Sequence, residues 1–286
     1  GKVGGDVKVG DTVTLTVHGK TYTGQVVDQG GGKLGYSINV PGAELAKDSN
    51  VHASVTATDN AGNSKTAEAD KGYGIDLEAK ATITIDTIAG DDVINATEKV
   101  KTIPVTGTVG GDAKVGDTVT LTVHGKTYTG QVVDQGGGKL GYSINVPGSE
   151  LAQDSNVHAS VSVTDPAGNT ASAAADRPYG VDLEAKATIT INTIAGDDVI
   201  NATEKAKTIP VTGTVGGDAK VGDTVTLTVH GKTYTGQVVD QGGGKLGYSI
   251  NVPGSELAQD SNVHASVSVT DPAGNTASAA ADRPYG

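Results

Sequence analysis

Acidic side chains concentrate in two similar segments of this sequence, and oxygen donors of this kind suggest a divalent cation site. Like charges this close together repel each other unless a cation lies between them. Because Ca²⁺ takes six to eight oxygen ligands, calcium is the natural counter-ion. The alternative is an acidic linker that is solvated and binds nothing. The two groups are Asp70, Asp76, Glu78, Asp86, Asp91, Asp92, Asn95 and Glu98, and then Asp176, Asp182, Glu184, Asn192, Asp197, Asp198, Asn201 and Glu204.

A second oxygen-rich motif, Asp-x-Ala-Gly-Asn, occurs three times. Each copy lies in the turn before the last expected strand of a repeat, at the pole where the preceding linker should enter. We therefore expect Asp165 to approach the segment 76–86, so that both acidic groups share one site. The alternative is a tight turn in which the aspartate caps its own backbone and no metal is needed. The motif contributes six candidate ligands: Asp59, Asn63, Asp165, Asn169, Asp271 and Asn275.

These motifs recur because the chain is a tandem repeat. Val109–Gly180 reappears without change as Val215–Gly286, an offset of 106 residues, and Val3–Gly74 is a slightly drifted copy of both. Near-identity at a domain-sized spacing indicates one folding unit repeated along the chain. Function is therefore predicted to reside in the string of domains more than in any single pocket.

Within one repeat, apolar residues alternate with polar or hydroxyl residues, which is typical of half-buried strands. Val119, Leu121 and Val123 are expected to face the core. No segment predicts a helix longer than one turn, which falls at 149–154. About seven short strands per hundred residues predict an all-β chain of immunoglobulin-like antiparallel β-sandwich domains arranged end to end. The expected strands are 81–86, 102–109, 117–124, 128–134, 140–146, 157–164 and 170–175.

The repeat boundaries predict three domains. Residues 79–184 form a complete repeat, 185–286 a further one, and 1–78 a partial one. The partial repeat lacks counterparts of 79–106, which supply the first strand and most of the second. A sandwich without these strands would expose its core and two sheet edges. Either the boundary lies elsewhere, or a terminal domain is cut, or a neighbouring chain completes it.

Composition narrows the class of protein. The chain has no Cys, Met, Trp or Phe, so the core must consist of Val, Ile, Leu, Ala and nine Tyr, without disulfides. A net charge of −12 disfavours nucleic acid and anionic membranes as partners and favours cations. No apolar run approaches the ~18 residues that a membrane span requires. The absence of Cys is consistent with an exported bacterial protein. The lack of an initiator Met indicates a piece of a longer one.

Enzyme chemistry is not predicted. The segment 30–34 lacks the leading Gly and the Ser or Thr of a phosphate-binding loop. The two histidines of each repeat, such as His124 and His158, lack zinc-ligand spacing and are interpreted as structural. Every candidate catalytic group recurs in every copy, and an enzyme seldom triplicates its active site without drift.

Three segments carry a family resemblance: IDTIAGDDVINATE at Ile85–Glu98, GDTVTLTVHGKTYTG at Gly116–Gly130, and VTDPAGNT at Val163–Thr170. They resemble the immunoglobulin-like extender repeats of giant RTX adhesins from biofilm-forming and ice-binding bacteria, and the resemblance covers the whole chain. It implies an extracellular stalk at the bacterial cell surface. In that family, calcium stiffens the domain junctions and the stalk holds terminal binding domains away from the cell.

The resemblance also implies calcium ligands. At the second junction Asn192 stands where the first has Asp86, which lowers the charge there. The calcium-binding nonapeptide of RTX proteins is absent, so such repeats would lie outside this chain. The implied ligands are Asp76, Asp86, Asp91, Asp92 and Asp165, and then Asp182, Asp197, Asp198 and Asp271.

Two functions follow from this reading. The first is a calcium-stiffened extender segment of an adhesin, whose partners are calcium ions and neighbouring repeats and whose adhesion target is bound by other domains. The alternative is a module that recognises carbohydrate or protein through its pole loops. A recognition stalk would be expected to diversify these loops, but 135–139 and 165–169 are the same as 241–245 and 271–275. Uniformity favours the spacer.

Overall fold

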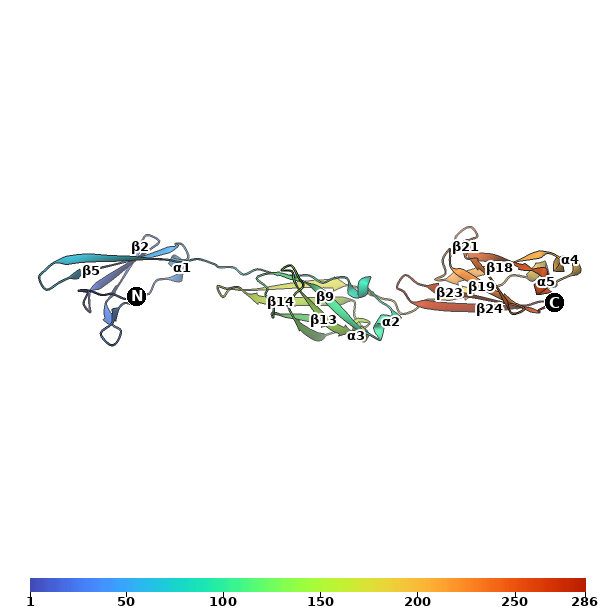
Figure 1. Ribbon diagram of the computed structural model, residues 1–286, viewed down its shortest axis with the longest axis horizontal. Coiled ribbons are helices and arrows are strands. Elements are labelled where there is room, and N and C mark those ends of the chain that lie inside the picture. The colour runs from blue at the N-terminus through green and yellow to red at the C-terminus, as the bar shows by residue number, and fades with distance from the viewer. The chain divides into compact units, whose positions relative to one another are not determined.

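The computed structural model describes all residues from Gly1 to Gly286, and it confirms an all-β fold. The chain divides into two compact units, Gly1–Glu78 and Ala79–Gly286 (Figure 1). The second unit contains two sets of paired sheets. We refer to residues 1–78, 79–184 and 185–286 as the first, second and third domains. None of the helices is long and apolar enough to cross a membrane.

The second domain is a sandwich of two four-stranded antiparallel sheets, with strand orders β11-β10-β14-β15 and β12-β13-β9-β7. Its strands are β7 (Ala81–Ile83), β8 (Val93–Ile94), β9 (Thr102–Gly111), β10 (Thr118–Val123), β11 (Lys126–Gln131), β12 (Val133–Asp134), β13 (Leu140–Pro147), β14 (Asn156–Thr164), β15 (Thr170–Pro178) and β16 (Gly180–Val181). Its helical turns are η1 (Ile88–Gly90), α2 (Ala96–Lys99) and α3 (Gly148–Leu151).

Alternation along the strands forms the core. In β10, Val119, Leu121 and Val123 are fully buried while the intervening threonines are partly exposed, as the sequence predicted. Tyr142 of β13 is also fully buried, and its hydroxyl donates to the Thr84 carbonyl at 2.7 Å. Gly107 of β9 permits this approach, because a Cβ there would lie 2.0 Å from the Thr84 oxygen. The phenol thus links β13 to the segment after β7, across β9 of the same sheet, without leaving an unpaired polar group.

The third domain repeats this architecture, with sheet orders β20-β19-β23-β24 and β17-β18-β22-β21. Its strands are β17 (Ala187–Ile189), β18 (Thr208–Gly217), β19 (Thr224–Val229), β20 (Lys232–Gln237), β21 (Val239–Asp240), β22 (Leu246–Pro253), β23 (Asn262–Thr270) and β24 (Thr276–Pro284). Its helical turns are η2 (Ile194–Gly196), α4 (Ala202–Lys205) and α5 (Gly254–Leu257).

The first domain keeps one complete sheet, β2-β1-β5-β6, and reduces the other to the pair β3-β4. It has no counterpart of β7 or β8, and its buried core cluster contains only Val7, Val13, Leu15, Val26 and Val55. Its elements are β1 (Thr12–Val17), β2 (Lys20–Gln25), β3 (Val27–Asp28), β4 (Leu34–Gly35), α1 (Gly42–Leu45), β5 (Asn50–Thr58) and β6 (Ser64–Gly72).

Candidate functional site

The linker that leaves the second domain is held against that domain. β16 pairs in parallel with β8, and the Asp182 N–H then donates to the Ile94 carbonyl at 3.0 Å. This pairing places Asp182 beside the loop that leads into α2. Asn95 caps α2: its Oδ1 accepts from the N–H groups of Thr97 and Glu98, and the Glu98 carboxylate accepts from the Asn95 N–H. Linker and cap therefore lie side by side at one pole of the domain.

The Asp271–Asn275 turn of the third domain is internally bonded. Asp271 Oδ1 accepts from the Asn275 N–H at 2.8 Å, and Oδ2 accepts from Asn275 Nδ2 at 3.0 Å. Gly274 has a φ of +92°, a conformation that glycine adopts without strain. The turn therefore has the geometry of the alternative to a metal site, a tight turn in which the aspartate caps its own backbone.

The same turn contacts the second domain directly. Asn275 Nδ2 donates to the Asp182 carbonyl at 2.7 Å, while Asn275 Oδ1 accepts from the Ala96 N–H at 2.8 Å. Asn95 Nδ2 donates to the Ala273 carbonyl at 2.9 Å. The contact buries the turn, since Asp271 is 5% exposed and Asn275 6%.

Two carboxylates meet at this junction. Burial raises the pKa of Asp271, but hydrogen bonds from Asn275 and the Ala273 N–H, and one with Asp182, hold that pKa below its usual value. Asn275 Nδ2 lies 3.4 Å from Asp182 Oδ1 and 3.0 Å from Asp271 Oδ2, so the two carboxyl groups lie on one amide nitrogen. Two carboxylates at this distance repel each other unless one is protonated or a cation lies between them. Oxygen-only donors with excess negative charge fit Ca²⁺ in chemistry, although they provide only part of its usual ligand number.

Asp92 and Asp198 already have a cationic partner within the protein. Asp92 accepts from Arg177 Nε at 3.1 Å and from Arg177 Nη2, and Asp198 is paired with Arg283 in the same way. The Arg177 side chain accordingly lowers the pKa of Asp92, and Arg283 lowers that of Asp198. These aspartates anchor the turns η1 and η2 to the last strand of each sandwich, and an arginine already balances the charge of each one.

The remaining predicted ligands lie in local turns or strand pairs. Asp86 Oδ2 accepts from Thr106 Oγ1 at 2.7 Å, and its counterpart Asn192 donates to Thr212 Oγ1 at 3.0 Å. Asp91 and Asp197 accept from backbone N–H groups two residues ahead, and Asp76 accepts from the Glu78 N–H. No group of three or more His, Cys, Asp or Glu side chains has an arrangement that would hold a metal ion. The turns Asp59 with Asn63 and Asp165 with Asn169 have the same internal bonds as Asp271 with Asn275.

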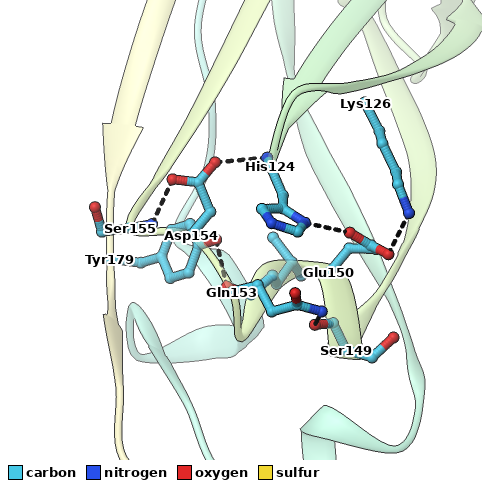
Figure 2. Close-up of polar contacts among 9 residues, drawn as sticks. His124, Lys126, Ser149, Glu150, Gln153, Asp154, Ser155 and Tyr179 are labelled. Carbon is cyan, nitrogen blue, oxygen red and sulfur yellow. Dashed lines mark hydrogen bonds and ion pairs between the residues drawn. The ribbon is translucent and has the colours of Figure 1, made fainter.

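His124, in the turn between β10 and β11, belongs to a closed network of hydrogen bonds (Figure 2). The His124 N–H donates to Asp154 Oδ2 at 2.6 Å, and its Nδ1 lies 2.7 Å from Glu150 Oε2. Lys126 Nζ donates to Glu150 Oε1 at 2.6 Å, and Lys126 and His124 together lower the pKa of Glu150. The network fixes a hairpin in which His124 adopts a φ of 50°, and it recurs in all three domains.

Sequence reasoning did not identify the donors at the junction. In the sequence, Asn95 is one more oxygen group in an acidic segment, and nothing marks the Ala96 N–H. The Asn-x-x-Glu spacing does signal a helix cap. A cap alone, however, does not reveal a partner 178 residues away.

No family model matches the chain, and no curated protein does. A solved structure described as giving insight into host cell surface retention of a 1.5-MDa bacterial ice-binding adhesin is 40% identical. The match covers 100% of this chain and 88% of that one, with a TM-score of 0.85. This chain belongs to the immunoglobulin-like extender repeats of giant bacterial RTX adhesins.

A second solved structure agrees with this family. It is described as a Ca²⁺-stabilized adhesin that helps an Antarctic bacterium reach out and bind ice, and is 44% identical over 99% of this chain and 66% of that one, with a TM-score of 0.65. A single immunoglobulin-like domain from the M. primoryensis ice-binding adhesin is 42% identical, covering 37% of this chain and 100% of that one, with a TM-score of 0.34. Like these adhesins, the repeats belong outside the cell, at the bacterial surface.

Proposed function

We propose that these adhesin repeats form a segment of a non-enzymatic extender stalk whose domain junctions are stiffened by calcium. The observation that carries the proposal is the junction between the second and third domains, where the Asp271–Asn275 turn is buried against Asp182 and Asn95. A stalk holds other domains away from the cell only if its junctions resist bending. A buried contact between consecutive domains provides such resistance.

Calcium fits this junction through its charge. Asp182 and Asp271 would hold the ion, and its positive charge would remove the repulsion between a carboxylate of the linker and one of the third domain. The resemblance to an adhesin described as Ca²⁺-stabilized supports the same assignment. Binding by a folded junction stabilises the folded state by mass action, because the unfolded chain does not bring these groups together.

Thermal unfolding of the full chain in EDTA, 10 mM CaCl₂ and 10 mM MgCl₂ tests the proposal. A site with a Kd of ~10⁻⁴–10⁻³ M, as in extracellular modules, would add roughly 1.5–3 kcal/mol in the calcium sample. Asp182→Asn should remove most of the gain at this junction. Asp240→Asn is the matched control. It removes the same charge, but from an exposed hairpin turn that Asp240 caps. Equal midpoints in all three solutions would rule out calcium stiffening.

A further inference from the structure

We infer that the first domain is a strand acceptor, with a groove that binds an extended segment of another polypeptide whose sequence pattern is that of residues 81–85. The groove has a volume of about 260 Å³ and is lined by residues 2–4, by Tyr36 and by the strands β5 and β6. We call it the acceptor groove. The inference goes beyond the proposed stalk function, and it does not depend on calcium.

The second and third domains show what fills the equivalent groove. Residues 106 positions apart are equivalent, so the acceptor groove corresponds to the site of β7 in the second domain and of β17 in the third. β7 packs against β14 and β15, and β17 packs against β23 and β24. Ile83 and Ile85, like Ile189 and Ile191, belong to the buried cores. In two of the three copies, the same groove therefore holds a strand with isoleucines at alternate positions.

The apolar walls of the acceptor groove are uncovered. Ala67 and Ala69 of β6 are exposed, whereas the equivalent Ala173 and Ala175 of β15 are partly buried. The side chains are the same in both copies, so the difference in exposure comes from the strand that packs over β15. Burial of this apolar surface favours binding of such a strand to the first domain.

The backbone beside the groove is free to pair with an added strand. In the second domain, β7 pairs antiparallel with residues 109–111 at the end of β9. The equivalent residues 3–5 have no strand on that side, and their neighbour Lys2 makes one bridge on the other side, to Gly35 of β4. An added strand can therefore form the same ladder, by strand addition to a free edge.

The hydroxyl of Tyr36 is placed to bind a carbonyl of the added strand. In the second domain, the equivalent Tyr142 donates to the Thr84 carbonyl at 2.7 Å. A Cβ on Gly107 would lie 2.6 Å from the Tyr142 hydroxyl. A Cβ on Gly1 would lie at the same distance, 2.6 Å, from the Tyr36 hydroxyl. The phenol therefore has the same position in both copies, and it can donate to the fourth residue of a strand that begins as 81–85 does.

A free strand fits the groove better than a folded second copy of this chain does. In a second copy, residues 81–83 and 187–189 are already paired within sandwiches. The edge strand β6 beside the groove also carries Lys65 and Glu68, where β15 has alanines. Charged side chains on an edge strand oppose its pairing with the edge of another molecule. The occupant is therefore an extended segment that is not already part of a sandwich.

The test uses the full chain and a fluorescein-labelled peptide with the sequence of residues 79–86, AKATITID. Fluorescence anisotropy in EDTA and in CaCl₂ measures its binding. We expect saturable binding of one peptide per chain, equal in both solutions, because the equivalent grooves of the second and third domains are filled. The same peptide with Ile83→Asp and Ile85→Asp should not bind, since its two charges would lie against apolar walls.

Two tyrosine variants locate the bound peptide. Tyr36→Phe should weaken binding about five-fold, because one hydrogen bond across the groove is lost. Tyr142→Phe is the matched control and should leave the affinity unchanged, since its acceptor Thr84 lies in its own domain. Saturable binding that Tyr36→Phe leaves unchanged would place the peptide elsewhere and overturn the inference.

Three other results would also overturn the inference. They are an absence of saturable binding, equal binding of both peptides, and binding of three peptides per chain. Sedimentation of the chain alone should show a monomer. A dimer that the peptide dissociates would assign the groove to a second copy and overturn the inference as well. None of these results bears on calcium at the junctions, so the proposed function is tested separately.

Discussion

Asn95 and Asn275 use both polar atoms of their side chains, the oxygen as a hydrogen-bond acceptor and the nitrogen as a donor. An aspartate at position 95 or 275 would accept hydrogen bonds but could not donate one across the junction. The oxygens of Asn95 and Asn275 accept from backbone N–H groups, and the nitrogens donate to carbonyls of another segment. Sequence reasoning that treats Asp and Asn together as oxygen donors for a metal misses this second use.

The hydrogen-bond and ion-pair partners of the acidic residues are a second feature that the sequence does not reveal. The grouping of Asp86, Asp91 and Asp92 in sequence is real, but their side chains have separate local partners in the fold. Arg177, which neutralises Asp92, lies 85 residues away. Spacing therefore predicted where negative charge accumulates, and it could not predict which carboxylates meet.

A matched pair of tyrosines gives a prediction for single hydrogen bonds. Tyr142→Phe should destabilise the second domain by about 1 kcal/mol, because the hydrogen bond from the buried phenol to the Thr84 carbonyl is lost. Tyr36 is the same residue in the first copy, where no counterpart of Thr84 exists, so Tyr36→Phe should be nearly neutral. Chemical denaturation of both variants measures the difference. Equal losses would show that the hydrogen bond to Thr84 does not account for the destabilisation.

At the scale of elements, one peptide takes two structures in the same molecule. The octapeptide LGYSINVP forms β13 and β22 over its full length, but in the first domain only Leu34 and Gly35 are in a strand. β13 and β22 pair with β9 and β18, whose counterpart in the first domain is reduced to residues 1–5, with one bridge between Lys2 and Gly35. Local propensity is identical in the three copies, so the neighbouring strand decides the outcome.

Hydrogen exchange can measure this effect of context. We expect slow exchange for alternate amides of Tyr142–Val146 and Tyr248–Val252, which form ladder bonds within a sandwich. The identical residues 36–40 should exchange orders of magnitude faster, because most of them lack a strand partner. The comparison needs no variant, since sequence and solution conditions are shared. Similar protection in all three copies would contradict the reduced sheet of the first domain.

At the scale of the whole molecule, the fold class was predictable from sequence because alternation and turn residues are local signals. The alternating core of β10 and the single helical turn near 149–154 followed from the same signals. Two kinds of feature did not. Parallel pairing of β16 with β8 and docking of the third domain on the second join segments far apart in sequence, and no periodicity encodes them.

The two compact units should unfold separately, because their cores differ in size. The first domain buries only a small cluster, whereas the second and third each bury a full sandwich core. Calorimetry of the full chain in EDTA should therefore show a first transition from residues 1–78 and a later one from the rest. Val13 and Val119 occupy equivalent positions in the first and second domains, and both are almost fully buried. Val13→Ala and Val119→Ala therefore show which transition belongs to which unit. Each should cost about 2 kcal/mol through lost apolar burial and the cavity left behind. The first should lower only the early transition and the second only the late one. A single transition lowered by both variants would show that the units unfold as one cooperative body.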